Sequence, residues 1–169
     1  MIFGAMSDTH GNSVLMHEAA CTMKDEFGAD LIFHLGDDYE DAVELEMAGY
    51  EVRKVPGLWC PAYHDSRVPR HLLETVDGVA VACAHAEKDL RAVERAASII
   101  LIGHTHTASL QLLGRSLYVN PGHLKARVSR GRRASFALIE IAPHAVHARI
   151  LGLEGTARTH LTVDRSRLG

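Results

Sequence analysis

The sequence lacks the features that would direct it to a membrane or to a polyanion. No apolar run approaches the roughly 20 residues that a membrane-spanning helix requires. The apolar stretch at the amino terminus is interrupted at Asp8, so we expect no signal peptide. The formal net charge is only −3, so we expect no broad electrostatic binding to nucleic acid or to anionic lipid. We therefore expect a cytoplasmic protein with no membrane or nucleic-acid partner.

Cysteine and aromatic residues are scarce as well. The three cysteines, Cys21, Cys60 and Cys83, are odd in number and scattered, which predicts reduced thiols and argues against a disulfide framework. Aromatic residues make up 5% of the chain, so the core must consist mainly of Val, Leu, Ile and Ala. The length of 169 residues, 47% of them hydrophobic, predicts a single domain over residues 1–169.

Short apolar runs and turn residues outline the secondary structure. Asn12 or Ser13 can cap a helix that runs to about Phe27, where Gly28 ends it. Further helices are expected at residues 41–47 and 87–97. Strands are expected at residues 2–7, 31–35, 50–55, 78–83, 98–102, 110–113, 116–119, 135–141 and 146–151. The stretch 58–71 is expected to be irregular, and the chain beyond Gly155 is expected to form a tail or a short edge element.

The first part of the chain alternates strand and helix, whereas the last part is rich in strands. This order predicts an α/β protein in which a mixed sheet packs on a second sheet, with helices outside. Open α/β sheets bind ligands at the carboxyl ends of their strands. Five loops that follow predicted strands hold Asp8 and His10, Asp37 and Asp38, Gly57, His85, and His104 and His106.

Histidine is the residue type in excess, with 12 in the chain, and it is the commonest metal ligand. A carboxylate has two oxygens and can bridge two metal ions, so Asp37 is the natural bridge. Mixed oxygen and nitrogen ligands suit Mn²⁺, Fe, Zn²⁺ or Ni²⁺. Two such ions about 3.5–4 Å apart can share a hydroxide and neutralise a phosphate ester during displacement.

The chain resembles the calcineurin-like metallophosphoesterases, and within them the small YfcE-like phosphodiesterases. The matching motifs occur in family order: Ser7-Asp8-Thr9-His10-Gly11, His34-Leu35-Gly36-Asp37, His85, Gly103-His104-Thr105-His106 and Asn120-Pro121-Gly122. The resemblance implies a four-layer α-β-β-α sandwich of two mixed sheets with two metal ions at one end. It implies a first metal held by Asp8, His10, Asp37 and His106, and a second held by Asp37, His85 and His104.

The chain departs from the family pattern at four positions. Leu58 replaces the asparagine that ligates the second metal, and Trp59 stands where some relatives have a proton-donating histidine. Glu87 and His123 replace a histidine and a serine. Three residues of the altered loop could replace the missing ligand: Cys60, His64 and Asp65. We expect instead that water or a backbone oxygen fills the position and that the second metal is held weakly.

Other polar residues near the motifs are assigned lesser roles. His34 is expected to support a neighbour by hydrogen bonding, and Asp38 to be a solvated loop acid. Arg127, Arg130, Arg132 and Arg133 are interpreted as a solvated hairpin turn around Gly131, with phosphate binding as the minor alternative. Arg67 and Arg70 are expected nearer to the site, where they can meet a substrate phosphate.

The sequence thus predicts a metal-dependent phosphodiesterase or phosphomonoesterase. Asp37, His104 and His64 form the predicted catalytic set, with a histidine or water protonating the leaving oxygen. The expected partner is a small phosphate ester, and assembly into a homo-oligomer is left open. The alternative is a protein-interaction scaffold, as in the retromer subunit that shares this fold. The loss of asparagine at Leu58 is compatible with it, whereas His10, His104 and His106 argue for catalysis.

Overall fold

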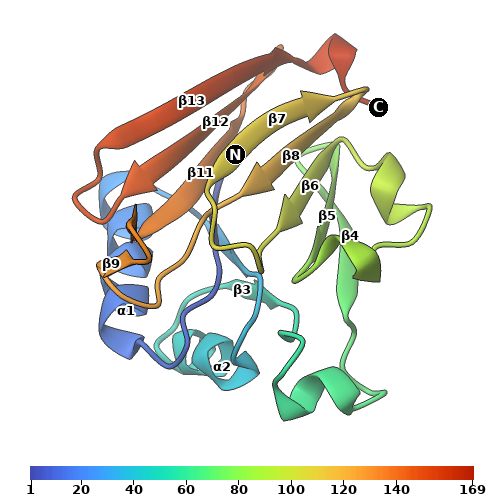
Figure 1. Ribbon diagram of the computed structural model, residues 1–169. Helices are drawn as coiled ribbons and strands as arrows, with labels where there is room; N and C mark the ends of the chain where they lie inside the picture. Colours follow the sequence, from blue (N-terminus) through green and yellow to red (C-terminus); the bar gives the residue numbers. More distant parts are fainter.

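A computed structural model describes all residues, from Met1 to Gly169. Its strands form two mixed sheets that pack face to face, with a small two-stranded ribbon beside them (Figure 1). The strands are β1 (Ile2–Met6), β2 (Leu31–His34), β3 (Val52–Lys54), β4 (His71–Val76), β5 (Val79–Ala84), β6 (Ile99–Ile102), β7 (Ser109–Leu113), β8 (Ser116–Asn120), β9 (Val128–Ser129), β10 (Arg132–Arg133), β11 (Ser135–Ile141), β12 (Ala145–Gly152) and β13 (Ala157–Asp164).

The six-stranded sheet has the order β13-β12-β11-β1-β2-β3, and the five-stranded sheet has the order β4-β5-β6-β8-β7. Strands β1, β2 and β3 are parallel to one another, as are β5, β6 and β8, while the outer pairs are antiparallel. Two mixed sheets with helices outside confirm the predicted fold class. The parallel strands matter most, because the loops that leave their carboxyl ends form the site.

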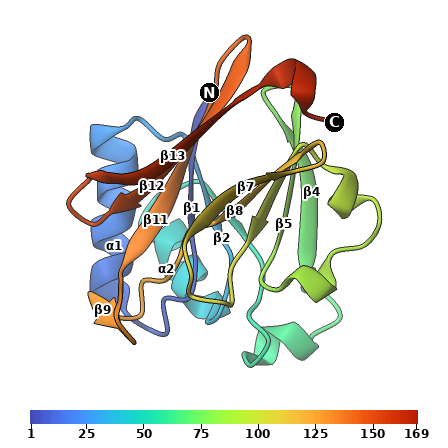
Figure 2. The same ribbon diagram turned by 45° about the horizontal axis from the view of Figure 1, so that its top comes forward.

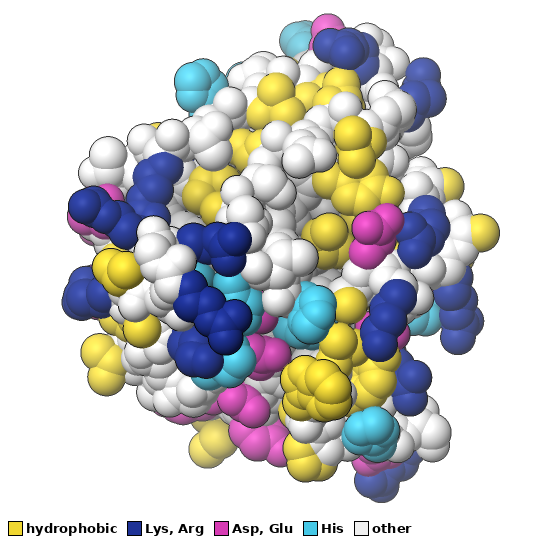
Figure 3. All heavy atoms as spheres, in the orientation of Figure 1, with side chains coloured by type: hydrophobic (Ala, Val, Ile, Leu, Met, Phe, Trp, Pro, Cys, Tyr) yellow, Lys and Arg dark blue, Asp and Glu magenta, His cyan; other side chains and the backbone are white.

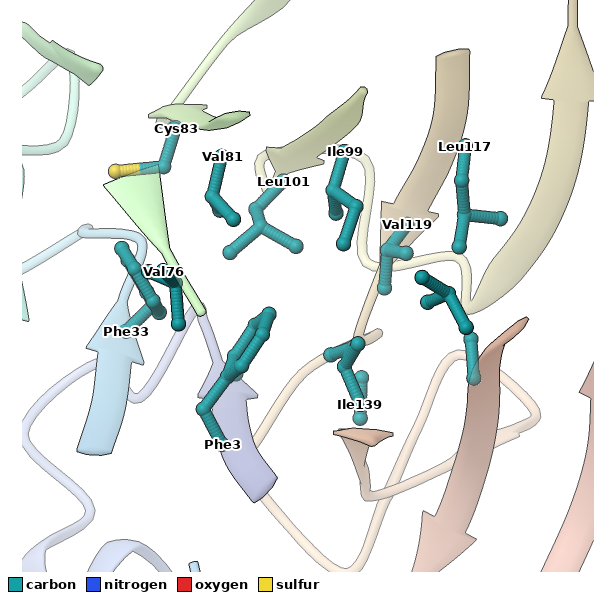
Figure 4. Close-up of a cluster of buried hydrophobic side chains, with 14 of the residues drawn as sticks. Phe3, Phe33, Val76, Val81, Cys83, Ile99, Leu101, Leu117, Val119 and Ile139 are labelled. Atoms are coloured by element: carbon teal, nitrogen blue, oxygen red, sulfur yellow. The ribbon is translucent and has the colours of Figure 1, made fainter. Parts of the chain in front are cut away.

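The largest hydrophobic cluster lies between the two sheets. Figure 4 shows Phe3, Phe33 and Ile139 from the six-stranded sheet facing Leu101 and Val119 from the five-stranded sheet. All five side chains are buried, and Phe3 meets Phe33 edge to face with ring centroids 5.4 Å apart. Burying such side chains is worth about 1.5–3 kcal/mol each. The contact therefore holds the two sheets in fixed relation, and with them the loops at their ends.

Helices α1 (Ser13–Cys21) and α2 (Tyr39–Met47) cover the outer face of the six-stranded sheet (Figure 2). The side chain of Asn12 caps α1 by accepting a hydrogen bond from Leu15 N at 3.2 Å, as predicted. The helical path continues as a π-helix over Thr22–Glu26, so the predicted extent to about residue 27 is confirmed. No helix of the structure combines the length and apolar character that crossing a bilayer would demand.

The predicted helix at residues 87–97 is wrong. Two short 3₁₀ helices, Glu87–Asp89 and Glu94–Ala96, occupy this stretch outside the five-stranded sheet. The buried Glu94 carboxylate lies 2.9 Å from His71 Nδ1 and accepts a hydrogen bond from Arg91 N. Tyr63 Oη donates to the carboxylate of Asp89 at 2.7 Å. These tertiary contacts hold the segment in a form that the local helix preference does not specify.

Four strands differ from the sequence prediction. Strand β4 lies in part within the stretch expected to be irregular, and it was missed altogether. Asp77 and Gly78 join it to β5 with φ angles of 47° and 75°, the positive values of a tight hairpin. The Asp-Gly pair is thus the signal that could have revealed β4. The short strands β9 and β10 were expected only as a hairpin turn. The chain beyond Gly155 is an edge strand, β13, which forms seven residue pairs with β12.

Candidate metal centre

The candidate site lies where loops from both sheets meet, at the carboxyl ends of β1, β2, β5 and β6. Asp8 N donates a hydrogen bond to Gly36 O at 2.9 Å, and Gly103 N donates to His85 O at 3.0 Å. A Cβ atom on Gly103 would overlap with Ser7 Oγ. Glycine is therefore required where the loop after β6 passes the loop after β1, and this close approach brings the two sheets' polar residues together.

Asp8, His10, Asp37 and His106 present ligand atoms that all lie within 4.8 Å of one another. Asp37 Oδ2 is 2.6 Å from His10 Nε2, and Asp8 Oδ1 is 3.1 Å from His106 Nε2. The two imidazole Nε2 atoms are 3.3 Å apart. Figure 3 shows histidine and carboxylate side chains gathered on this face of the molecule, with Lys and Arg side chains along one side. The four residues predicted for the first metal thus converge.

Three buried atoms of this centre have no well-aligned hydrogen-bond partner, although imidazole nitrogens lie 2.6 Å and 3.1 Å from the two oxygens: Asp37 Oδ2, Asp8 Oδ1 and His85 Nε2. Buried polar atoms are nearly always paired, since an unpaired one costs about 1–3 kcal/mol. Carboxylate oxygens and imidazole nitrogens, without thiolate, are the donors that divalent transition metals accept. The donor set therefore fits a divalent metal ion, which would satisfy these atoms together.

His85 and His104 extend the centre on the other side of Asp37. His85 Nε2 is 3.4 Å from Asp37 Oδ1, and the rings of His85 and His104 meet edge to face at 5.1 Å. His85 Nδ1 lies 2.7 Å from Leu35 O, a distance at which the protonated nitrogen donates to the carbonyl. That bond sets the tautomer and leaves the Nε2 lone pair free for a metal. Asp37 therefore has one oxygen toward each side.

The side chain at Leu58 has no atom that can coordinate an ion. Of the three candidates to replace it, Cys60 donates its thiol to Gly57 O at 3.2 Å, and the Asp65 carboxylate accepts hydrogen bonds from Arg67. His64 is exposed and packs edge to face on Tyr63. The structure brings none of the three into the ligand cluster.

Four of the six non-glycine residues with positive φ are candidate ligands. They are Asp8 (55°), His10 (49°), His104 (66°) and His106 (56°). Left-handed backbone is unfavourable for such residues by about 1–3 kcal/mol and persists only where the surroundings impose it. Its concentration in the Asp-x-His and His-x-His motifs indicates that the surrounding structure imposes this backbone on both loops.

A buried hydrogen-bond chain supports the loop after β1. Asp41 accepts hydrogen bonds from Thr9 Oγ1 and from Gly11 N, the latter at 3.0 Å. The buried His34 ring lies on the other side of Thr9, with Nε2 3.3 Å from Oγ1. This confirms the supporting role expected for His34. Asp41 could not be predicted from the sequence, because an acid in the first turn of a helix normally faces solvent.

The Asn120-Pro121-Gly122 motif forms a turn that supports the site through its hydrogen bonds. Asn120 Nδ2 donates to Gly103 O at 2.9 Å and to Thr105 Oγ1 at 3.0 Å, and its Oδ1 accepts from Gly122 N. Asn120 therefore holds the loop that contains His104 and His106 from behind.

Burial dominates the electrostatics of the centre. It raises the pKa of Asp8 to about 7, and the adjacent Asp37 carboxylate adds to the increase. It lowers the pKa of His106 to about 4, with a further contribution from His10, and it lowers the pKa of His85. His85 and His106 are thus neutral at pH 7, as ligands must be, and a cation would favour the charged form of Asp8.

The arginines of residues 127–133 are exposed on a hairpin around Gly131, as predicted. Arg67 pairs with Asp65, and Arg70 stacks on Tyr63, with its guanidinium carbon 4.2 Å from the ring centroid. Arg130 and Arg132 instead line a pocket together with His104, Thr105, His106 and Ser129. The hairpin that was assigned mainly to solvent thus borders the metal centre, and nothing local in the sequence reveals that proximity.

A comparison with protein families finds one match. The model described as the calcineurin-like phosphoesterase superfamily domain matches residues 1–143. This range includes every candidate ligand and the arginine hairpin. Among curated proteins, none matches the chain.

Solved structures with the same fold include both phosphoesterases and sorting proteins. A predicted phosphoesterase from Streptococcus pneumoniae is 24% identical, with a TM-score of 0.72, and the match covers 97% of each chain. The phosphoesterase YfcE from E. coli is 17% identical, with a TM-score of 0.73, over 95% of this chain and 98% of that one. Vps29 from Entamoeba histolytica, complexed with Zn²⁺, is 18% identical, with a TM-score of 0.68, over 98% and 99%. At these identities the likeness establishes the fold alone, and it confirms the metallophosphoesterase-like sandwich.

Proposed function

The chain belongs to the calcineurin-like phosphoesterase superfamily, and we propose that it is a metal-dependent phosphodiesterase that hydrolyses small phosphate esters. The observation behind the proposal is the convergence of Asp8, His10, Asp37 and His106, whose ligand atoms lie within 4.8 Å of one another. Two buried oxygens of this cluster, Asp8 Oδ1 and Asp37 Oδ2, have no well-aligned hydrogen-bond donor, and neither does the neighbouring His85 Nε2. A protein that used this surface only for contacts would gain nothing from leaving such atoms unsatisfied.

The residues divide into two groups around Asp37. Asp8, His10, Asp37 and His106 would hold one divalent ion, and Asp37, His85 and His104 would hold a second. Bound divalent ions supply an activated water molecule and positive charge for the phosphoryl oxygens. Mn²⁺, Fe, Zn²⁺ and Ni²⁺ all accept these ligands, so the donor set does not select one of them.

The chain's own groups keep the centre ready for these ions. Leu35 O holds the tautomer of His85, and His104 N donates to Asp8 Oδ2 at 3.0 Å. Asp37 belongs to both sets of candidate ligands, so its position sets the distance between the two proposed metal sites. His104 is exposed at the mouth of the pocket with Arg130, where a phosphate ester can enter. Asp37 and His104 are therefore the residues we assign to catalysis.

Hydrolysis by the metal-loaded protein tests the proposal. Purified protein is stripped with a chelator, reloaded with Mn²⁺ or Zn²⁺, and assayed with bis(4-nitrophenyl) phosphate and 4-nitrophenyl phosphate. We expect metal-dependent release of 4-nitrophenol, faster from the diester. Metal binding without hydrolysis of either ester would overturn the proposal.

The competing function is a protein-interaction scaffold of the same fold. Two observations favour it: Leu58 removes one donor, and Vps29 proteins are among the structural relatives. Metal content and hydrolysis separate the two, because a scaffold has no need to turn over an ester. Failure of both assays would leave the scaffold as the better explanation.

A further inference from the structure

A basic hairpin borders the metal centre. Strands β9 and β10 are joined by Arg130 and Gly131, both with positive φ, of 50° and 77°. The guanidinium groups of Arg130, Arg132 and Arg133 have no carboxylate partner, whereas Arg127 on the same hairpin pairs with Glu18 at 2.7 Å. In a chain with net charge −3, three adjacent unpaired arginines are not explained by a general excess of cations.

Two adjacent pockets join this hairpin to the metal centre. The first, of about 130 Å³, is lined by His104, His106, Arg130 and Arg132 together with Thr105 and Ser129. The second, of about 290 Å³, shares His106 and Arg132 with the first and adds Arg133 and Arg158 among its lining residues. Neither pocket has a carboxylate in its wall. Because Arg158 pairs with Glu154 at 3.6 Å, the strip of unpaired positive charge that leads away from the candidate ligands consists of Arg130, Arg132 and Arg133.

The hairpin is tied to the residues behind the metal centre. The ring of the buried His123 lies with Nε2 3.3 Å from Arg132 O, and its centroid is 5.5 Å from that of His106. Arg158 Nη1 donates to Arg133 O at 3.3 Å. These contacts hold the hairpin backbone in place, so the arginines face the pockets from a fixed base.

Guanidinium groups bind phosphate with two parallel hydrogen bonds, which makes arginine the preferred residue for this anion. The reacting phosphate belongs at the metal ions, which neutralise its charge. The arginines lie along one side of the candidate metal site and extend away from it. They therefore suit a second anionic group of the substrate, separate from the reacting phosphate.

We propose that Arg130 and Arg132 bind a second phosphate of the substrate and so select small phosphodiesters that bear an additional phosphomonoester. The proposal rests on the proposed function, because it assigns the reacting phosphate to the metal centre. Arg133 extends the same strip and lies where it can contact the rest of the substrate.

A matched pair of chromogenic substrates tests the selection. Thymidine 5′-(4-nitrophenyl phosphate) is compared with the same compound bearing a 3′-phosphate, using Mn²⁺-loaded protein at low salt. In both, water displaces 4-nitrophenolate at phosphorus, so only the added phosphate differs. We expect kcat/KM to be about tenfold higher for the 3′-phosphate, the effect of one charge-assisted hydrogen bond, and to lose this advantage in Arg132→Gln and Arg130→Gln. Arg127→Gln, whose guanidinium is paired in the wild type, is the matched control and should retain it.

Binding provides a readout that does not depend on turnover. Thymidine 3′,5′-bisphosphate should bind about tenfold more tightly than thymidine 5′-monophosphate in calorimetry, and the difference should shrink in Arg132→Gln and at high salt. If neither ester is hydrolysed but this difference holds, the phosphodiesterase assignment fails and the phosphate site stands. If Arg132→Gln weakens both members of each pair equally, the arginine serves the reacting phosphate and the proposed selection is wrong. Equal kcat/KM for the two esters in the wild type would also overturn it.

Discussion

The two proposed halves of the candidate metal centre share Asp37 but differ in how many ligands they bring together. The first half combines Asp8, His10 and His106 with Asp37, and their ligand atoms lie within 4.8 Å of one another. The second half has only His85 and His104 beside the shared carboxylate, and Leu58 stands where a further donor is expected.

The two halves differ less in their support from the backbone than in their number of ligands. Asp8 N donates to Gly36 O in the first half, and His85 is held by Leu35 O in the second. Both halves are therefore held by the backbone, but only the first brings its ligand atoms within 4.8 Å of one another, and the second has one ligand fewer. The second half should bind an ion more weakly, yet remain usable when the ion is abundant.

The largest effect should come from the residue that both halves share. Asp37→Asn should reduce metal-dependent hydrolysis by roughly two orders of magnitude or more, since even outer residues of metal sites typically contribute about 10–100-fold. The side chain belongs to a loop, so the fold should persist in circular dichroism. Asp38→Asn, which changes the exposed neighbouring acid outside the cluster, is the control and should retain activity. Equal activity in the two variants would refute the role of Asp37.

Adding a donor atom at Leu58 should reduce the difference in metal affinity between the two halves. In the wild type, calorimetric titration with Mn²⁺ should resolve one tighter and one weaker site. Leu58→Asn should tighten the weaker site by about tenfold and raise activity at low metal concentration. Leu58→Ala, which shortens the side chain without adding a donor, should not. Two equally tight sites in the wild type would show that another group already completes the shell.

The buried acid of the first half should make the metal-free protein sensitive to pH. The pKa of Asp8 is raised to about 7 in the folded state, from 3.8, so the folded state binds the proton more tightly than the unfolded chain. Stability from this group is therefore full below pH 4 and declines as the pH rises toward 7.

The variant Asp8→Asn isolates this contribution. With chelator present, its free energy of unfolding should increase relative to the wild type as the pH rises from about 4 to about 7. Urea denaturation at several pH values measures the difference. A constant difference across this range would mean that burial of Asp8 is compensated in some other way.

The smallest effect is expected at a histidine outside both halves. His64 is exposed on a 3₁₀ helix, Pro61–His64, and makes no hydrogen bond to any candidate ligand. His64→Ala should therefore change kcat by less than about twofold, whereas a residue acting in general acid catalysis contributes about 10²–10⁴-fold. A large loss of kcat, with metal content unchanged, would restore His64 to the catalytic set.

Much of the centre was predictable because its ligands are local features of strand ends. Parallel strands all run in the same direction. The residues that follow their last buried positions therefore lie together at the carboxyl ends of the strands. That is why Asp8, Asp37, His85 and His104 could be placed together before any tertiary structure was known. The cap at Asn12 was equally local, since it depends on residues three positions apart.

The errors lie where tertiary contacts outweigh local preference. Residues 87–97 have helical composition, but Glu94 is drawn inward to His71 and the segment breaks into two 3₁₀ helices. Asp41 has the composition of a solvated first-turn acid, but it is buried against the loop after β1. In each case a distant polar partner decided the outcome.

The sequence by itself determined the fold class, most of the strands and the chemical type of the ligands, because these follow from hydrophobic pattern and residue identity. Only the tertiary structure decided which strands became edges, that Cys60, His64 and Asp65 stay out of the cluster, and that Arg130 and Arg132 border His104 and His106. The physical reason is that such proximities depend on how the two sheets pack and on where the β9–β10 hairpin is anchored. Residues about 25 positions apart along the chain, as His106 and Arg132 are, carry no local signal of sharing a pocket.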